Sequence, residues 1–379
     1  MGFEYILCRD DAAAVGALLQ HSPLNATFIP TGIGINHRTP GLLTELSSLP
    51  PLDPSRVATI EAFGAEIHPL DPIGAQVRGI DLSSMEAPPA AVIQALEQEM
   101  ASRGFIVFKN EKQLEVDDFL RASCWWGGKE LHSTHGVHPA TPGGNPHIFR
   151  LSNDRRIGIP GVGPQWHNDG SFIPRTFSHS GYHIIRPAEK GGGTSFAHQG
   201  AAYDALPEAR QEFWSRLSSV NSSSGVVHPV VHVHPVSGRK CIWLHLGMTG
   251  AVIEKLPDTD GFRLLDAEEM KQLCQEYNDI LDAGLDNGYA IAYEYQENDC
   301  VFIDNLAVAH RASPEAHLPA EKQGLRIMHR STVRGVQELA PDFGLPIHLD
   351  IHGPNPFGTG VWQGGGIGFR WDDGIPMQN

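Results

Sequence analysis

The alternation of apolar and polar residues is irregular at the start of the chain and becomes regular further along. An apolar stripe at helical spacing, bounded by Pro88-Pro89 and Gly104, predicts a first helix. The unbroken apolar run Phe105–Phe108 that follows is typical of a buried strand. Two further helices are predicted over Val116–Ala122 and Pro207–Leu217.

The second half of the chain carries the clearest strand signals. Asp266 and Glu269 have the spacing of a capping box, and an apolar helical face follows them. Three strands are then predicted, over Tyr289–Tyr295, Cys300–Ile303 and Leu325–Val333. Many β-branched and aromatic runs separated by turns favour a mainly β fold with flanking helices (α+β), built on a double-stranded β-helix or jelly roll.

Three regions follow from this pattern. Residues 1–73 form an N-terminal extension whose packing the pattern does not define, and residues 74–335 form one large domain. Residues 336–379 are a tail rich in glycine and proline. Because the tail contains Trp362 and Trp371, we expect it to pack against another surface.

Composition narrows the classes of partner and compartment. The chain of 379 residues has a formal net charge of −16, which argues against nucleic acid or an anionic membrane as its partner. No apolar run is long enough to span a bilayer, and the first residues lack the order of a signal peptide. The five cysteines are scattered, so neither a disulfide framework nor a cysteine zinc site is expected. Together these features predict a cytoplasmic protein.

The run Gln165–Phe172 places a histidine and a carboxylate, His167 and Asp169, two residues apart. Residues i and i+2 of a strand point the same way, so both side chains can bind one ion. A second histidine, His310, ends another strand-like run far downstream. Two histidines and one carboxylate leave three coordination positions open, an arrangement typical of non-haem Fe(II) oxygenases.

Two arginines near the end of the domain suggest sites for anions. In the alternating run Leu325–Thr332, Arg326 and Arg330 share one face and lie about 13 Å apart, at roughly 3.3 Å per residue. They therefore serve two anions or two ends of one site. An oxygenase that takes electrons from a 2-oxo acid needs such an arginine for the distal carboxylate. A glycine-rich turn delivers Thr194, whose hydroxyl can bond the carboxylate that Arg326 binds.

These motifs resemble the taurine dioxygenase / 2,4-D dioxygenase family of Fe(II)- and 2-oxoglutarate-dependent oxygenases. The resemblance covers Gly74 to Arg334 and includes the buried run that starts at Gly104. The matching motifs are Trp166-His167-x-Asp169, Gly192-Gly193-Thr194-x-Phe196-Ala197, Asp304-Asn305-x4-His310-x-Ala312 and Arg326-x3-Arg330.

The resemblance implies Fe(II) and 2-oxoglutarate as cofactors, O2 as a co-reactant and a small-molecule substrate. Iron would be bound by His167, Asp169 and His310. The distal carboxylate of 2-oxoglutarate would be bound by Thr194 and Arg326.

It also implies a substrate site that takes a carboxylate or sulfonate. Arg330 would bind this anion, helped by His132 or His135. Taurine-oxidising members typically have an asparagine where this chain has Gly163, which argues against taurine. Asp169 favours hydroxylation-type chemistry over halogenation. Hydroxylation, desaturation and oxidative cyclisation stay open, as does whether the chain forms a homo-oligomer.

Two other classes of protein compete with this interpretation. A zinc-type cupin hydrolase would use the same triad but gives Thr194 and Arg326 no role. A non-catalytic jelly-roll binding module would not need all five of the iron and 2-oxoglutarate residues intact, namely His167, Asp169, His310, Thr194 and Arg326. A further group of histidines, His228, His232 and His234, is expected on the exposed flank of an edge hairpin and not in a metal site.

Overall fold

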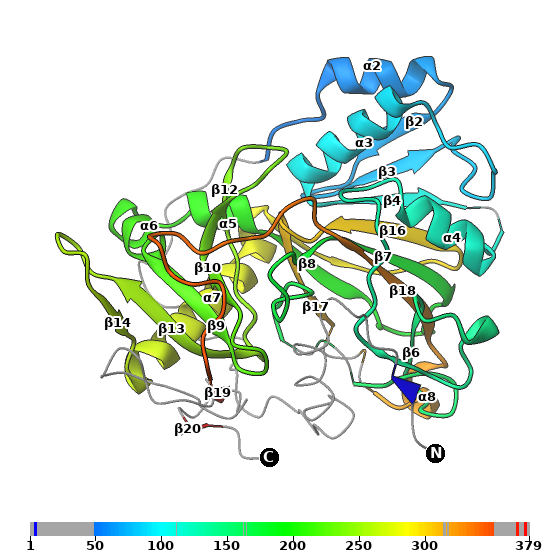
Figure 1. The fold of residues 1–379 in the computed structure, drawn as a ribbon. Coiled ribbons are helices and arrows are strands. Elements are labelled where there is room, and N and C mark those ends of the chain that lie inside the picture. The colour runs from blue at the N-terminus through cyan, green and yellow to red at the C-terminus, as the bar shows by residue number, and fades with distance from the viewer. Residues whose placement is uncertain are drawn as a thin grey trace.

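The computed structural model describes residues 4–5, 49–110, 112–161, 163, 165–313, 316, 318–351, 369–370 and 375–376. Within these residues the fold is a double-stranded β-helix, with helices outside its two facing sheets (Figure 1). The predicted mainly β fold with flanking helices is therefore confirmed.

The larger sheet forms the wall that carries most of the predicted strands. Its neighbours run antiparallel except for the parallel pair β3–β4. In spatial order its strands are β2 (Glu66–Pro69), β3 (Ala75–Arg78), β4 (Phe105–Lys109), β16 (Asp299–Asp304), β7 (Phe177–Arg186), β18 (Ile327–Arg334) and β6 (Phe149–Ser152). The smaller, facing sheet contains β15 (Ala290–Tyr293), β8 (Thr194–His198) and β17 (Val308–Ala312).

The core lies in three layers around these sheets. Between them, aromatic and branched residues of both sheets interlock, and the tilted rings of Phe105 and Phe196 have centroids 4.6 Å apart. Helices α3 (Ala90–Arg103) and α4 (Val116–Ser123) cover the outer face of the larger sheet. Helices α5 (Gln199–Asp204) and α7 (Ala267–Asn287) cover the smaller one (Figure 1).

The predicted Pro207–Leu217 helix is shorter in the structure, Glu208–Trp214, because Leu217 begins a strand, while the other helix predictions hold for local physical reasons. Gly104, with a positive φ of 92°, ends α3, and a Cβ there would lie 2.2 Å from the Val308 side chain. Asp266 and Glu269 form both bonds of the predicted capping box at the start of α7. Two strand predictions need a change. The strand β18 begins at Ile327 and has a register shift after it, so Arg326 lies just outside the strand. The strand predicted over Tyr289–Tyr295 is Ala290–Tyr293, so Tyr295 lies beyond its end.

An additional sheet packs beside the β-helix, on the left of Figure 1. Its strands are β10 (Val227–Pro229), β9 (Leu217–Asn221), β13 (Thr249–Lys255) and β14 (Phe262–Leu264). Part of the C-terminal tail packs on it through Leu345, Leu349 and Ile351. Trp362 and Trp371, on which that packing was predicted, lie outside the described residues.

The segment before residue 74 also contributes to the fold, through α2 (Pro54–Ala62), which packs on α3, and β2. The remaining short elements are β1 (Glu4–Tyr5), β5 (Gly136–Val137), α6 (Glu208–Trp214), β11 (Val231–Val233), β12 (Lys240–Ile242), α8 (Ala320–Gln323), β19 (Phe369–Arg370) and β20 (Ile375–Pro376). No helix in the described ranges has the length and apolar character needed to cross a bilayer.

The predicted exposed histidine hairpin is wrong. His228, His232 and His234 are all buried. The rings of His228 and His232 hydrogen-bond to backbone carbonyls, and His234 Nε2 lies 3.0 Å from Asp304 Oδ2. These histidines satisfy buried oxygens between elements, which a run of alternating residues does not reveal.

Candidate metal centre and cosubstrate pocket

The two histidines of the predicted triad are cross-strand partners. His167 and His310 exchange both backbone hydrogen bonds, at 3.1 and 3.0 Å, in a single antiparallel bridge beside β17. This pairing sets the imidazole rings 4.2 Å apart. His167 lies in a short bridge and not in a strand as predicted, yet the bridge delivers the same juxtaposition.

Asp169 is fixed from both its backbone and its side chain. The Asn305 amide accepts from Asp169 N at 2.7 Å and donates to its carbonyl at 2.8 Å. Ser180 on β7 donates to Asp169 Oδ2 at 2.8 Å. Arg330 on β18 donates to Oδ1, also at 2.8 Å. The carboxylate is therefore oriented before any ion binds.

The protonation states suit metal binding. Burial lowers the pKa of His167 and that of His310, so both imidazoles are neutral. Burial alone would raise the pKa of Asp169, but Arg330, His310, His167 and Ser180 lower it below its ordinary range. His167 Nδ1 donates to the Gln165 carbonyl at 2.7 Å, which leaves Nε2 as the ligand atom.

Candidate ligand atoms of His167, Asp169 and His310 all lie within 4.8 Å of one another, and the three residues are buried. Among the described residues they form the one group of three or more His, Cys, Asp or Glu with such spacing. His310 Nδ1 is also buried without a hydrogen-bond partner there. Neutral nitrogens and one oriented carboxylate form a donor set that suits Fe(II).

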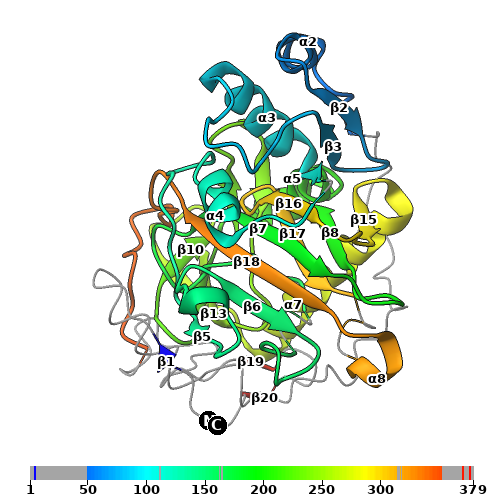
Figure 2. The same ribbon diagram turned by 90° about the vertical axis from the view of Figure 1, so that its right-hand side faces the viewer.

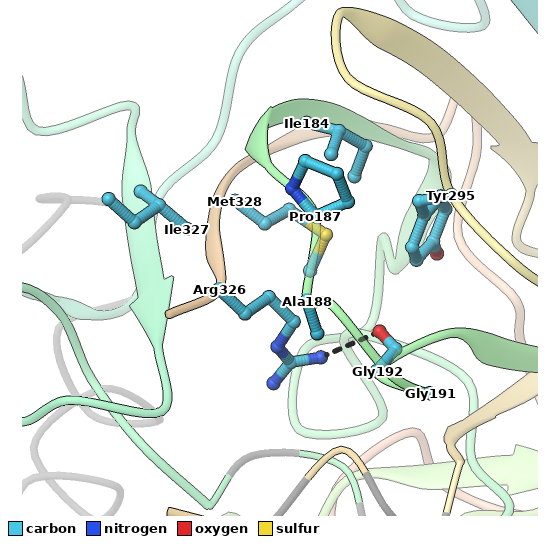
Figure 3. Close-up of a pocket in the computed structure, with 9 residues that line it drawn as sticks. All are labelled: Ile184, Pro187, Ala188, Gly191, Gly192, Tyr295, Arg326, Ile327 and Met328. Carbon is cyan, nitrogen blue, oxygen red and sulfur yellow. Dashed lines mark hydrogen bonds between the residues drawn. The ribbon is translucent and has the colours of Figure 1, made fainter. Parts of the chain in front are cut away.

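Arg326 lies in a small pocket, which is shown in Figure 3. Its Nη1 donates to the Gly192 carbonyl at 3.2 Å, while its Nε is buried without a partner. No carboxylate in the described part of the chain pairs with this guanidinium. Thr194 is buried at the start of β8, directly after the glycine turn that contacts Arg326. The pocket therefore has an arginine with unfilled hydrogen-bonding capacity, as an anion site requires.

Comparison with known proteins identifies the family. Residues 66–332 match the family described as "Taurine catabolism dioxygenase TauD, TfdA family". The chain belongs to this family. Its predicted class, an Fe(II)- and 2-oxoglutarate-dependent dioxygenase, is confirmed at this level, and the zinc hydrolase and the non-catalytic module are set aside.

Several relatives of the TauD/TfdA family resemble the chain. It is 24% identical over 294 residues to an alpha-ketoglutarate-dependent sulfonate dioxygenase of Saccharomyces cerevisiae, covering 70% of this chain and 66% of that protein. It is 24% identical over 279 residues to an alpha-ketoglutarate-dependent sulfate ester dioxygenase of Pseudomonas putida, covering 66% and 85%. A taurine dioxygenase structure from Burkholderia xenovorans shares the fold, with a TM-score of 0.59 at 20% identity over 77% of this chain and 96% of that one.

The iron and 2-oxoglutarate of the TauD/TfdA family fit this chain. The triad offers the donor set for the ion, and the Arg326 pocket offers an unpaired guanidinium for a carboxylate. Within the described residues, His310 Nδ1 in the triad and Arg326 Nε in the pocket are buried without hydrogen-bond partners.

The structure brings together only some of the residues predicted to bind substrate. Arg330 lies over the Phe149 ring at 4.7 Å, and the His135 ring lies against the same ring at 4.4 Å. Burial and the nearby Arg330 lower the pKa of His135 to about 3, so its ring is neutral. His135 is thus on the metal side of β18. His132 is buried elsewhere, against Arg334 and Phe177.

One residue beside the triad was not singled out from the sequence. The His245 ring lies 5.1 Å from that of His167, and its Nδ1 is buried without a partner among the described residues. Burial and His167 lower the pKa of His245 to about 3. The sequence does contain a feature that could have pointed to His245. In the run Trp243-Leu244-His245-Leu246 this one polar residue interrupts a buried apolar segment.

Proposed function

We propose that this chain oxidises a C–H bond of a small substrate bearing a sulfonate or a sulfate ester group, with 2-oxoglutarate converted to succinate and CO2. His167, Asp169 and His310 bind the iron. Thr194 and Arg326 bind the distal carboxylate of 2-oxoglutarate, and Arg330, with the His135 ring beside it, binds the substrate anion.

A single observation supports the substrate assignment: a guanidinium lies directly at the metal-binding carboxylate. Arg330 contacts Asp169 Oδ1 at 2.8 Å, while its Nε is buried with no hydrogen-bond partner among the described residues. We call the triad of His167, Asp169 and His310 the metal corner. A substrate oxyanion that reaches Arg330 Nε lies beside this corner, so the carbon next to the oxyanion is held near the metal. The substrates named for the yeast and Pseudomonas relatives favour sulfur oxyanions over carboxylates.

Iron, 2-oxoglutarate and O2, when bound, supply the oxidising chemistry. The protein positions the reactants and excludes water. Asn305 and Ser180 hold Asp169 in place, and Phe149 provides an apolar face beneath both Arg330 and His135. The one N–H of neutral His135 donates to the Gly136 carbonyl at 3.2 Å, so this ring borders the substrate oxyanion without adding charge.

Succinate release stimulated by substrate tests this proposal. The compounds are matched alkanesulfonates, alkyl sulfate esters, carboxylates and neutral sulfones of equal chain length, and products are identified by mass spectrometry. We expect stimulation by the sulfur oxyanions and weak stimulation by the sulfones. Equal stimulation by neutral sulfones, or stimulation by cationic amines alone, would exclude the assigned role of Arg330. The products also separate hydroxylation from desaturation and cyclisation.

A further inference from the structure

Tyr295 carries a buried hydroxyl that the protein leaves unused. It follows β15 in the turn that leads to β16, and it enters the pocket from a different side than Arg326 (Figure 3). Its oxygen is buried, and no described residue has hydrogen-bond geometry to it. Thr194 is near Tyr295, but the two hydroxyls do not have the geometry of a hydrogen bond. A buried polar group without a partner is unfavourable, so this hydroxyl calls for an explanation.

A neighbouring tyrosine provides the contrast. The rings of Tyr293 and Tyr295 meet edge to face at 5.6 Å. The Tyr293 hydroxyl donates to Asp299 Oδ2 at 3.1 Å and accepts from Lys109 at 3.0 Å. Both rings pack on the same core, yet only one hydroxyl is satisfied by the protein. Packing alone would be served equally well by phenylalanine at position 295.

The pocket also contains a second unfilled donor. In the part of the chain that the structure describes, Arg326 Nε is buried without a hydrogen-bond partner, and much of the remaining lining is apolar, with Ile184, Pro187 and Met328. A carboxylate offers about four acceptor positions, more than one arginine and one threonine can fill. Burial is the largest influence on Tyr295 and raises its pKa, so the phenol stays protonated and remains a donor.

We infer that Tyr295 is a third binding group for 2-oxoglutarate, donating its hydroxyl proton to the distal carboxylate that Arg326 binds. The inference rests on the role proposed above for Arg326. Tyr295 then selects for a 2-oxo acid with a carboxylate at its far end, because a methyl group at that place accepts no hydrogen bond.

Calorimetric titration of the Mn(II)-loaded protein tests this role without turnover. The ligands are 2-oxoglutarate and 2-oxopentanoate, which has a methyl group in place of the distal carboxylate. We expect Tyr295→Phe to weaken 2-oxoglutarate binding about tenfold or more, as for a lost hydrogen bond to a charged group. Binding of 2-oxopentanoate should not change. Tyr293→Phe is the matched control and should leave both affinities at the wild-type value.

Arg326→Ala separates the possible failures. If Arg326→Ala weakens 2-oxoglutarate binding and Tyr295→Phe does not, the role of Tyr295 is excluded while that of Arg326 stands. Equal weakening of both ligands by Tyr295→Phe would show a packing role and also exclude the inference. If Arg326→Ala binds 2-oxoglutarate like the wild type, the proposed anchor is wrong, and the role of Tyr295 falls with it.

Discussion

Arg326 and Arg330 belong to the same stretch of chain but meet opposite environments. Arg330, within β18, is paired with the Asp169 carboxylate at 2.8 Å and covers the Phe149 ring. Arg326, just before the strand, donates to the Gly192 carbonyl and pairs with no carboxylate among the described residues. Figure 2 shows β18 crossing the larger sheet between β6 and β7, and the start of β18 lies toward α8.

This difference shows which part of the site is complete before ligands bind. Arginine cannot lose its charge, so a buried guanidinium needs an anion nearby. For Arg330 the protein supplies that anion, and the metal corner is thereby oriented in advance. For Arg326 the partner must come from the ligand. Under the proposed function, the triad of His167, Asp169 and His310 is therefore preformed, and the Arg326 pocket becomes complete only when 2-oxoglutarate binds.

The largest expected effect comes from removing the preformed corner itself. Asp169→Ala, His167→Ala or His310→Ala should each lower turnover by more than about 100-fold, beyond the roughly 10–100-fold loss typical of an outer-sphere partner. Calorimetric titration with Mn(II) measures the loss of metal binding, and succinate release measures the loss of turnover. The exposed His68→Ala is the control and should retain both. A triad variant with near wild-type turnover would show that the metal site lies elsewhere.

Arg330→Ala tests whether the protein depends on its own ion pair. Breaking a buried pair by removing one partner typically costs about 3–5 kcal/mol, because the other charge stays buried. We therefore expect the metal-free protein to lose about 3 kcal/mol in its free energy of unfolding near neutral pH, measured with urea. A loss below about 1 kcal/mol would contradict the preformed corner.

The same variant has a defined pH dependence. In the wild type Arg330 helps to depress the pKa of Asp169, so the stability gained from this carboxylate is present at neutral pH and lost as pH falls through the folded-state pKa. Removal of Arg330 takes away the largest influence that lowers this pKa, so the pKa of Asp169 rises and the carboxyl takes up a proton at higher pH. The difference in unfolding free energy between wild type and variant should therefore shrink between pH 7 and pH 5. A gap that widens instead would mean that another group titrates.

Arg326→Ala should show the opposite division between stability and binding. The apparent Kd for 2-oxoglutarate should rise about 30-fold or more, from the roughly 2–5 kcal/mol lost when a buried charge pair is truncated. The unfolding free energy of the ligand-free protein should change by less than about 1 kcal/mol, since no protein charge is left unpaired. Thr194→Val should cost about 1 kcal/mol in 2-oxoglutarate binding. A strongly destabilised, ligand-free Arg326→Ala would remove the contrast between the two arginines.

The sequence predicted the chemistry of the metal corner better than its geometry. His167, Asp169 and His310 were grouped because these residue types at such positions suit iron, and the structure brings them together. The expected strand around His167 is a single bridge. Its partner, His310, is chosen by long-range pairing, which local periodicity does not encode.

Contacts between distant segments could not be predicted from the sequence. The pair between Arg330 and Asp169 spans 161 residues, and neither residue has a neighbouring motif that indicates the other. His245 reaches the triad from the segment after β12, and a lone histidine in a buried run is more often a packed core residue. Tyr295 resembles any strand-end aromatic until its unpaired hydroxyl is seen. In each case tertiary packing determines the role of the residue.

The smallest expected effect concerns the backbone beside the metal corner. Gly163 has a positive φ of 69°, its carbonyl accepts from Ala312 N at 2.7 Å, and a Cβ there would lie 2.9 Å from His167 Cε1. Gly161 has a nearly identical φ of 71° but no heavy atom within 4 Å of such a Cβ. The two glycines therefore form a matched pair in which only one substitution touches a metal ligand.

Gly161→Ala and Gly163→Ala should both pay about 1–3 kcal/mol for the left-handed conformation. Only Gly163→Ala should also displace the His167 ring and lower Mn(II) affinity, by about tenfold, as expected for disturbance of a ligand's surroundings. Thermal unfolding and calorimetry of both variants measure the two effects separately. Equal Mn(II) affinities would show that the His167 ring moves aside freely. The asparagine that taurine-oxidising members of the family typically have at this position would then be compatible with the metal site. Gly163 would no longer argue against taurine.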